Sequence, residues 1–201
     1  MTYTVKRYQT FQEYLDAEEL SEERNYRLLS TGEVIELSTE SELNRIITAA
    51  IIAAVLKIKG LKFIRHICPG NKDLQVRPVG DKWMNRKPDI MILTPTHLQE
   101  AKQAIFLEAP APAFVAEIVS PGSTSSESYL RDYVWKRSQY EWWQIPEYWI
   151  IDPHREKVTV LILVEGTYQE TVFVGESVIQ STAFPNIKLT VNALISGEID
   201  D

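Results

Sequence analysis

Cysteine, histidine and long apolar runs are all scarce in this chain of 201 residues. The single cysteine, Cys68, excludes an intramolecular disulfide and a metal site built from several cysteines. His66, His97 and His154 lie far apart and lack the spacing of zinc ligands. The longest apolar run, at residues 49–56, is far shorter than the roughly 20 residues of a membrane span. The N-terminus lacks the apolar core of a secretion signal, so we expect a cytoplasmic protein.

Basic residues are also in deficit, with 21 Lys and Arg against 28 Asp and Glu and a net charge of −7. The deficit is uneven, because residues 57–87 carry a net charge of +7 whereas residues 1–56 and 88–201 carry −5 and −9. Such a basic segment is typical of a surface that binds polyanions, although solvated strands and loops would give the same count. The candidates for contacts with nucleic-acid phosphates are Lys72, Arg77, Lys82, Arg86 and Lys87.

The length and the 44% content of hydrophobic residues suit one domain with its own core. We expect a single domain over residues 1–201. It would comprise an N-terminal helix and hairpin at 1–38, a core at 39–152 and a β-rich C-terminal extension at 153–201.

The sequence predicts alternating helices and strands. Capping boxes and apolar spacing predict helices over 11–20 and 40–58, and a third helix is expected over roughly 126–143. Strands are predicted at 26–29, 34–37, 62–68, 74–79, 89–93, 114–120, 147–152, 157–164 and 168–174. The stretch 94–113, rich in Pro and Ala, predicts a connection with little regular structure. This order predicts a mixed α/β fold (α+β), with a central mixed sheet flanked by helices.

Three side chains are candidates for chemistry. Asp89 begins a predicted strand after Pro88, and Glu117 lies in the middle of the apolar strand FVAEIVS, where an unpaired carboxylate is costly. On neighbouring strands these two carboxylates could hold one Mg²⁺, which needs only one or two of them. Lys136, on the next helix, could orient a water or stabilise charge on a phosphate. The phosphate-binding loop of nucleotide triphosphatases and the serine nucleophile elbow are both absent.

Four segments in order then resemble a known family: RKPDIMIL, FVAEIVSPGS, the spacing of Asp132, Lys136 and Tyr140, and IPEYWIIDP. Together they resemble the Uma2 endonucleases (DUF820), a family abundant in cyanobacteria and part of the PD-(D/E)XK nuclease superfamily. The resemblance implies a restriction-endonuclease-like fold and hydrolysis of phosphodiester bonds in nucleic acid, DNA above all, with Mg²⁺ or Mn²⁺. It also implies that Asp89 and Glu117 are metal ligands and that Lys136 is the catalytic lysine.

Further site residues follow from this hypothesis. The backbone carbonyl of Ile118 is a candidate metal ligand, and Glu42 or Glu36 a candidate additional acid. The alternative is that both have only structural roles, Glu42 as a helix-capping residue and Glu36 as a hairpin residue. A homodimer is expected, because many nucleases cut two strands with two subunits.

The sequence departs from the family pattern at two positions. Val119 stands two residues after Glu117, where the superfamily usually has its lysine, so the resemblance assigns that role to Lys136 instead. Leu43 stands roughly where family members usually carry a histidine. The alternative hypothesis is therefore a catalytically inactive nuclease-fold protein that binds nucleic acid or another protein.

Overall fold

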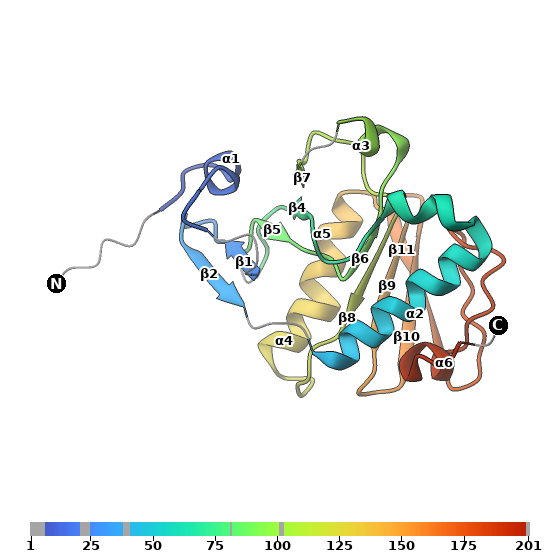
Figure 1. Cartoon of the computed structure of the whole chain (residues 1–201). Coiled ribbons are helices and arrows are strands. Elements are labelled where there is room, and N and C mark those ends of the chain that lie inside the picture. The colour runs from blue at the N-terminus through green and yellow to red at the C-terminus, as the bar shows by residue number, and fades with distance from the viewer. Residues whose placement is uncertain (1–6, 21–24, 38–40, 81, 101–102, 200–201) are drawn as a thin grey trace.

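A six-stranded mixed sheet forms the centre of the computed structural model, which describes residues 7–20, 25–37, 41–80, 82–100 and 103–199 (Figure 1). The strand order is β11-β10-β9-β8-β6-β3. β8 and β9 are parallel, and the other neighbours are antiparallel. The strands are β3 (Ile67–Cys68), β6 (Ile90–Ile92), β8 (Phe114–Ile118), β9 (Glu147–Asp152), β10 (Lys157–Val164) and β11 (Thr167–Val174). This sheet, with helices beside it, confirms the predicted fold class.

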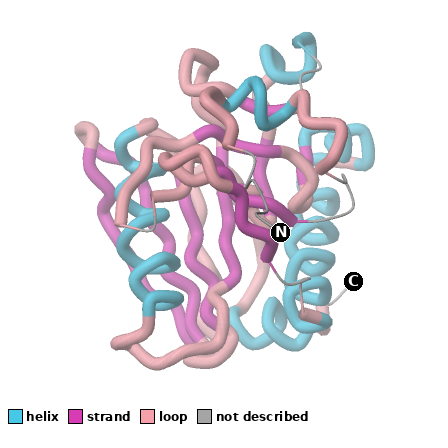
Figure 2. Tube along the Cα trace, turned by 90° about the vertical axis from the view of Figure 1, so that its left-hand side faces the viewer, coloured by secondary structure: helices cyan, strands magenta, loops and turns pink. Residues whose placement is uncertain are grey.

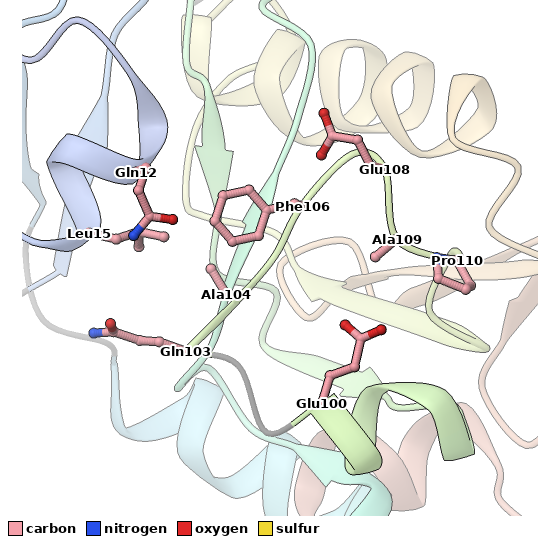
Figure 3. Close-up of a pocket in the computed structure, with 9 residues that line it drawn as sticks. All are labelled: Gln12, Leu15, Glu100, Gln103, Ala104, Phe106, Glu108, Ala109 and Pro110. Atoms are coloured by element: carbon pink, nitrogen blue, oxygen red, sulfur yellow. The ribbon is translucent and has the colours of Figure 1, made fainter.

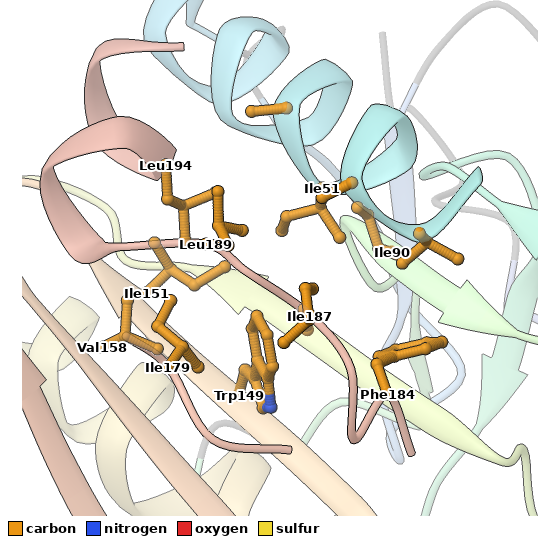
Figure 4. Packing of buried hydrophobic residues seen from close by; sticks show 14 of the residues in the cluster. Ile51, Ile90, Trp149, Ile151, Val158, Ile179, Phe184, Ile187, Leu189 and Leu194 are labelled. Atoms are coloured by element: carbon orange, nitrogen blue, oxygen red, sulfur yellow. The ribbon is translucent and has the colours of Figure 1, made fainter. Parts of the chain in front are cut away.

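Helices cover both faces of the sheet (Figure 2). α2 (Glu42–Lys59) and α6 (Val191–Ser196) lie over one face, and α5 (Lys136–Trp142) lies over the other. Because neighbouring residues of a strand point to opposite faces, Trp149 and Ile151 of β9 pack with α2, whereas Tyr148 and Ile150 pack with α5. The first of these two cores is drawn in Figure 4.

The helix predicted over 126–143 is present but is not uniform. It consists of α4 (Glu127–Leu130), a π-helical turn η2 (Arg131–Trp135) and α5. Ser126 caps its N-terminus by accepting a hydrogen bond from the amide of Tyr129. A π-turn inside a helix changes the direction of the side chains around it and is frequent at functional sites.

The N-terminal part of the chain packs beside one end of the central sheet (Figure 1). It contains α1 (Phe11–Leu15) and the hairpin of β1 (Asn25–Leu28) and β2 (Val34–Leu37), in which Gly32 adopts a positive φ of 83°. A three-stranded sheet follows, in the order β5-β4-β7. Its strands are β4 (Asp73–Gln75), β5 (Asn85–Arg86) and β7 (Ala104–Ile105). The hairpin and β5 lie side by side, since the Leu28 carbonyl accepts from the Met84 amide.

The strand predicted at 62–68 is wrong over most of its length. Residues Leu61–His66 form a 3₁₀ helix, η1, and only Ile67 and Cys68 are in a strand. The burial in this segment has a period of three rather than two: Phe63 and His66 stack at 4.8 Å between ring centroids, while Ile64 is exposed. Residues i and i+3 lie on the same side of a 3₁₀ helix. The alternation of polar and apolar residues in this segment therefore does not indicate a strand.

Other boundaries also differ from the predictions. The stretch 94–113 contains α3 (Pro95–Glu100) and β7, α1 ends at Leu15 rather than at residue 20, and β4 ends at Gln75. The N-cap of α2 is Ser41, whose hydroxyl accepts from the Asn44 amide, and Thr39 and Glu40 of the predicted capping box lie outside the described residues. β10 and β11, placed in the expected C-terminal extension, are strands of the central sheet itself.

Candidate active site

Glu117 points from β8 toward α5, because its strand neighbours Phe114, Ala116 and Ile118 pack on the α2 side. Only 4% of Glu117 is exposed. One carboxylate oxygen, Oε2, accepts a hydrogen bond from Lys136 Nζ at 2.8 Å, and Oε1 accepts from the hydroxyl of Tyr140. The buried charge is therefore compensated by one cation and one neutral donor.

Lys136 is shared between two carboxylates. Its Nζ lies 2.8 Å from Glu117 Oε2 and 2.8 Å from Asp132 Oδ1. Asp132 is almost fully buried in the π-helical turn, and its Oδ2 accepts from the Ser120 amide at 3.0 Å. Helix and strand are thus joined in a continuous polar network from Tyr140 through Glu117, Lys136 and Asp132 to the loop after β8.

The network holds Lys136 in its charged form. Burial alone would lower the pKa of this lysine, but the carboxylates of Asp132, Glu117 and Asp89 outweigh burial and raise its pKa. Burial, followed by the charge of Glu117, raises the pKa of Tyr140 well above its usual value. At neutral pH the site therefore presents an ammonium group and a neutral phenol that donates a hydrogen bond to Glu117.

Asp89 reaches the same place from the start of β6. Its Oδ2 accepts a hydrogen bond of 2.6 Å from the amide of Ile118, the residue directly after Glu117. β6 pairs with β8 so that Ile90 lies opposite Ala116. This register brings Asp89 and Glu117, which are 28 positions apart in the sequence, to one end of two neighbouring strands.

Asp89, Glu117, Ile118 and Lys136 all line one pocket of about 330 Å³. The pocket lies between the N-terminal hairpin, the ends of β6 and β8, and the π-helical turn. Its other lining residues are Asn25, Arg27, Leu37, Ser41, Asn44, Trp83, Arg86, Lys87, Ser120, Pro121, Arg131 and Asp132.

The donor set suits a hard divalent cation. Within the described residues, no three or more His, Cys, Asp or Glu side chains are grouped so as to hold a metal ion. Two carboxylates on one pocket wall, linked through the Ile118 amide, do match Mg²⁺, which keeps several water ligands and binds one or two carboxylates. Asp89, Glu117 and the carbonyl of Ile118 are the groups that would hold it.

The five predicted phosphate-binding residues do not all reach this pocket. Arg86 and Lys87 line it. Lys87 Nζ also lies 3.8 Å from Asp73 Oδ2. Lys72 lines a different small pocket, Arg77 stacks on the Trp142 ring at 3.5 Å, and Lys82 is exposed in a turn.

The two additional candidate acids lie outside the pocket. Glu42 is exposed in the first turn of α2 and pairs with Arg45, whose hydrogen bond lowers the pKa of Glu42. Glu36 is exposed on β2. Leu43 packs against the core on the α2 side, so the pocket receives Asn44 from the start of this helix.

A second cavity, of about 540 Å³, lies between α1 and the segment around β7 (Figure 3). Its lining includes Glu100 and Glu108 and no basic side chain. This charge disfavours a phosphate ligand, and the larger cavity is therefore not the candidate site.

A family model described as "Uma2: Putative restriction endonuclease" matches residues 11–192. The chain belongs to the Uma2 family. The predicted resemblance is thereby confirmed over most of the sequence. No match is found among curated proteins.

The Uma2 chain also resembles the crystal structure of a putative nuclease belonging to DUF820 from Anabaena variabilis ATCC 29413. The TM-score is 0.64 at 17% sequence identity, over 92% of this chain and 97% of the other. At this identity the likeness establishes the fold. No helix in the described part of the chain is long and apolar enough to cross a bilayer.

Sequence reasoning left several residues in and around the Uma2 pocket without a role. Asp132 and Tyr140 were noted for their spacing with Lys136, and positions four apart share a helix face, which is the signal for their common network. Arg27 and Arg131 gave no such signal, because β1 and the π-helical turn, on which they lie, are distant from each other in the sequence.

Proposed function

We propose that this Uma2 protein is a metal-dependent endonuclease that hydrolyses phosphodiester bonds in DNA, with Mg²⁺ or Mn²⁺ as its cofactor. The observation that supports the proposal is the convergence of Asp89, Glu117 and Lys136 on one pocket, with Lys136 Nζ 2.8 Å from Glu117. Three side chains pointing apart would have been incompatible with it.

Each residue has a distinct role in the proposed reaction. Asp89, Glu117 and the Ile118 carbonyl would hold the cation, which when bound lowers the pKa of a water ligand and polarises the phosphate. Lys136, kept charged by its carboxylate neighbours, would orient the attacking water or neutralise charge on the phosphate. Tyr140 and Asp132 fix the positions of Glu117 and Lys136 through their hydrogen bonds.

Cleavage of plasmid and linear DNA with Mg²⁺ or Mn²⁺ tests the proposal. We expect the wild type to cut and Glu117→Gln and Lys136→Ala to lose activity. Arg137→Ala is a matched control, because Arg137 neighbours Lys136 but pairs with Glu170 on the protein surface. Circular dichroism and thermal unfolding identify variants that have lost their fold. Cleavage that survives in folded Glu117→Gln and Lys136→Ala would contradict the proposed mechanism.

One observation favours a second candidate, a nuclease-fold protein that binds nucleic acid or another protein without cutting. Both carboxylate oxygens of Glu117 already accept hydrogen bonds, and Leu43 occupies a core position near the expected histidine. Calorimetric titration with Mn²⁺ discriminates the two candidates. Binding that is lost in Asp89→Asn and Glu117→Gln supports the nuclease, whereas no binding in the wild type supports the binding protein.

The nuclease proposal includes a homodimer. The exposed apolar side chains Val134 and Trp142 on the α4–α5 segment and Val172 and Val174 on the edge strand β11 offer surfaces for a second copy. Sedimentation at micromolar concentration tests this part of the proposal, and a monomer would remove it without affecting the proposed chemistry.

A further inference from the structure

Three arginines from distant parts of the chain surround one tryptophan in the pocket. Arg27 comes from β1, Arg86 from β5 and Arg131 from the π-helical turn. Their guanidinium carbons lie 5.6, 4.6 and 4.6 Å from the centre of the Trp83 ring. These distances are within the range of cation–π contacts. All four residues line the same pocket as Asp89 and Glu117.

Two of the three arginines are shielded from water. Arg27 is 5% exposed and Arg86 is 1% exposed. Like charges held together without water repel each other strongly. Burial, and the charge of Arg86 in addition, favour loss of the proton from Arg27 and lower its pKa, while Asp73 and Glu117 act in the opposite direction. A cluster of this kind is stabilised by a bound anion.

The described part of the protein does not satisfy every hydrogen-bond donor of Arg27. Within the described residues its Nη1 donates to the Asn25 side-chain oxygen at 2.5 Å and to the Tyr26 carbonyl at 2.7 Å, which are both neutral acceptors. Its Nε is buried and has no hydrogen-bond partner there. An arginine presents five donors in a planar fork, and this fork matches the oxygens of a phosphate.

The charges on the pocket wall favour the same ligand. The lining contains five basic side chains and three acidic ones, which leaves a formal charge of +2 before any cation is bound. A divalent cation at Asp89 and Glu117 would increase this excess. Two of the acids, Glu117 and Asp132, are already paired with Lys136, so the arginine side of the pocket carries most of the positive charge.

Trp83 supports the arginines rather than a nucleic-acid base. It lies within the basic segment 57–87, but only 6% of it is exposed, so its ring is not available for stacking with a base. The contacts to three guanidinium groups occupy the surroundings of its ring. The ring therefore acts as a rigid platform that positions the cluster.

We propose that Arg27, Arg86 and Arg131 form a phosphate subsite next to the carboxylates, and that it holds a phosphate of the nucleic acid other than the one that is cut. This inference rests on the proposed function for the identity of the substrate. A phosphodiester of the backbone and a phosphate at the end of a strand offer the same chemistry to the arginines.

Binding of DNA without cleavage tests the subsite. Fluorescence anisotropy in EDTA would compare Arg131→Gln with Arg137→Gln, using a short labelled oligonucleotide. The Arg131 and Arg137 side chains are 20% and 35% exposed, and each lies close to one surface glutamate, so both variants lose one comparable charge and are expected to fold. Arg27→Gln is the second subsite variant, with its fold checked by circular dichroism.

We expect Arg131→Gln and folded Arg27→Gln to weaken binding by about tenfold or more, as for a lost charged hydrogen bond. The slope of log affinity against log salt should fall by about 0.7 to 0.9. Arg137→Gln should bind like the wild type. Equal affinities of Arg131→Gln and Arg137→Gln would overturn the subsite.

The state of the oligonucleotide end distinguishes the two sources of phosphate. If a 5′-phosphate strengthens wild-type binding and Arg131→Gln removes that gain, the subsite holds a terminal phosphate. If Arg131→Gln weakens binding equally with and without the 5′-phosphate, the subsite holds a backbone phosphate. Because binding is measured in EDTA, a failure of the subsite is distinguishable from a failure of the nuclease proposal, which is measured as cleavage with metal.

Discussion

Glu117 in β8 and Glu147 in β9 are both buried glutamates on neighbouring parallel strands, but their surroundings differ. Glu147 accepts five hydrogen bonds: from Trp149 Nε1, the Ser181 hydroxyl, the amide and hydroxyl of Thr182, and the Ala183 amide, all at 2.6–2.8 Å. All five donors are neutral, and Glu147 is fully buried. Its carboxylate fastens the segment 181–183 to the sheet.

Glu117 has one cationic and one neutral donor and lines the pocket. The comparison teaches that burial of a carboxylate does not by itself identify a site. A carboxylate whose oxygens are saturated by neutral donors acts as a structural fastening. A carboxylate with few donors, a paired cation and an adjacent cavity retains capacity for a ligand.

The largest effect expected from this comparison is on catalysis. Glu117→Gln should reduce the rate of DNA cleavage by a factor on the order of 10³ or more, because a neutral amide is a poor ligand for the cation. Its unfolding free energy should fall by about 1–3 kcal/mol, because the buried Lys136 loses one of its two carboxylate partners and keeps only Asp132, while the amide oxygen still accepts a hydrogen bond from Tyr140. Cleavage assays and urea unfolding measure the two quantities. If Glu117→Gln lost much stability but cleaved DNA at the normal rate per folded molecule, Glu117 would have a structural role like that of Glu147.

The next effect concerns Glu147. Glu147→Gln places an amide group against several backbone and hydroxyl donors, so we expect a loss of about 2–4 kcal/mol in unfolding free energy. The rate of cleavage per folded molecule should stay unchanged. Urea unfolding gives the stability, with Glu170→Gln, an exposed glutamate on β11, as the control. A Glu147→Gln variant that keeps its stability but does not cleave DNA would contradict the different roles assigned to Glu147 and Glu117.

Asp152 extends the comparison to pH. Its carboxylate accepts from the amides of His154 and Arg155, from Arg155 Nη1 and from the hydroxyl of Tyr133. Burial would raise the pKa of Asp152, but the bonds from Tyr133 and Arg155 outweigh burial and lower it.

The lowered pKa of Asp152 makes its contribution to the free energy of unfolding depend on pH. A folded-state pKa below the unfolded value of about 3.9 stabilises the protein at neutral pH, and this stability is lost as the pH falls through the folded-state pKa. The destabilisation caused by Asp152→Asn should therefore be largest near neutral pH and should shrink below about pH 4. Urea unfolding at several pH values measures it, and a difference that is independent of pH would contradict the assigned cause.

The smallest effect is expected at Tyr140. Tyr140→Phe removes the neutral donor of Glu117 and should slow cleavage by about 2- to 10-fold, the value of one ordinary hydrogen bond. Tyr168→Phe is the matched control, because its hydroxyl donates to the Ile145 carbonyl and not to the site. Equal cleavage rates in the two variants would show that Tyr140 does not position Glu117.

Local sequence patterns predicted much of the sheet. Apolar runs located β6, β8, β9 and the β10–β11 hairpin, because these strands are long or buried enough for hydrophobicity to report them. The helix α2 followed from its apolar face. The prediction of a strand at 62–68 was wrong because the side chains of η1 follow a period of three on a partly exposed surface.

The candidate site was partly predictable for the same reason. Glu117 stands out because a carboxylate within an apolar strand has no inexpensive structural explanation. The cost of burial alone did not separate it from Glu147, which begins an equally apolar strand. The difference depends on the loop at 181–183 and on α5, and both reach their strands only in the folded chain.

The sequence by itself determined the order of the long helices and buried strands, the fold class and the identity of Asp89, Glu117 and Lys136 as candidates, because periodicity and the cost of buried charge are local properties. Only the tertiary structure decided which basic residues share the pocket with them. Arg27, Arg86 and Arg131 come from three separate elements, and their meeting around Trp83 depends on how the N-terminal hairpin packs beside β5 and the π-helical turn. Contacts between distant segments leave no periodic signal in the sequence, so the charge count of residues 57–87 could identify Arg86 but not its partners.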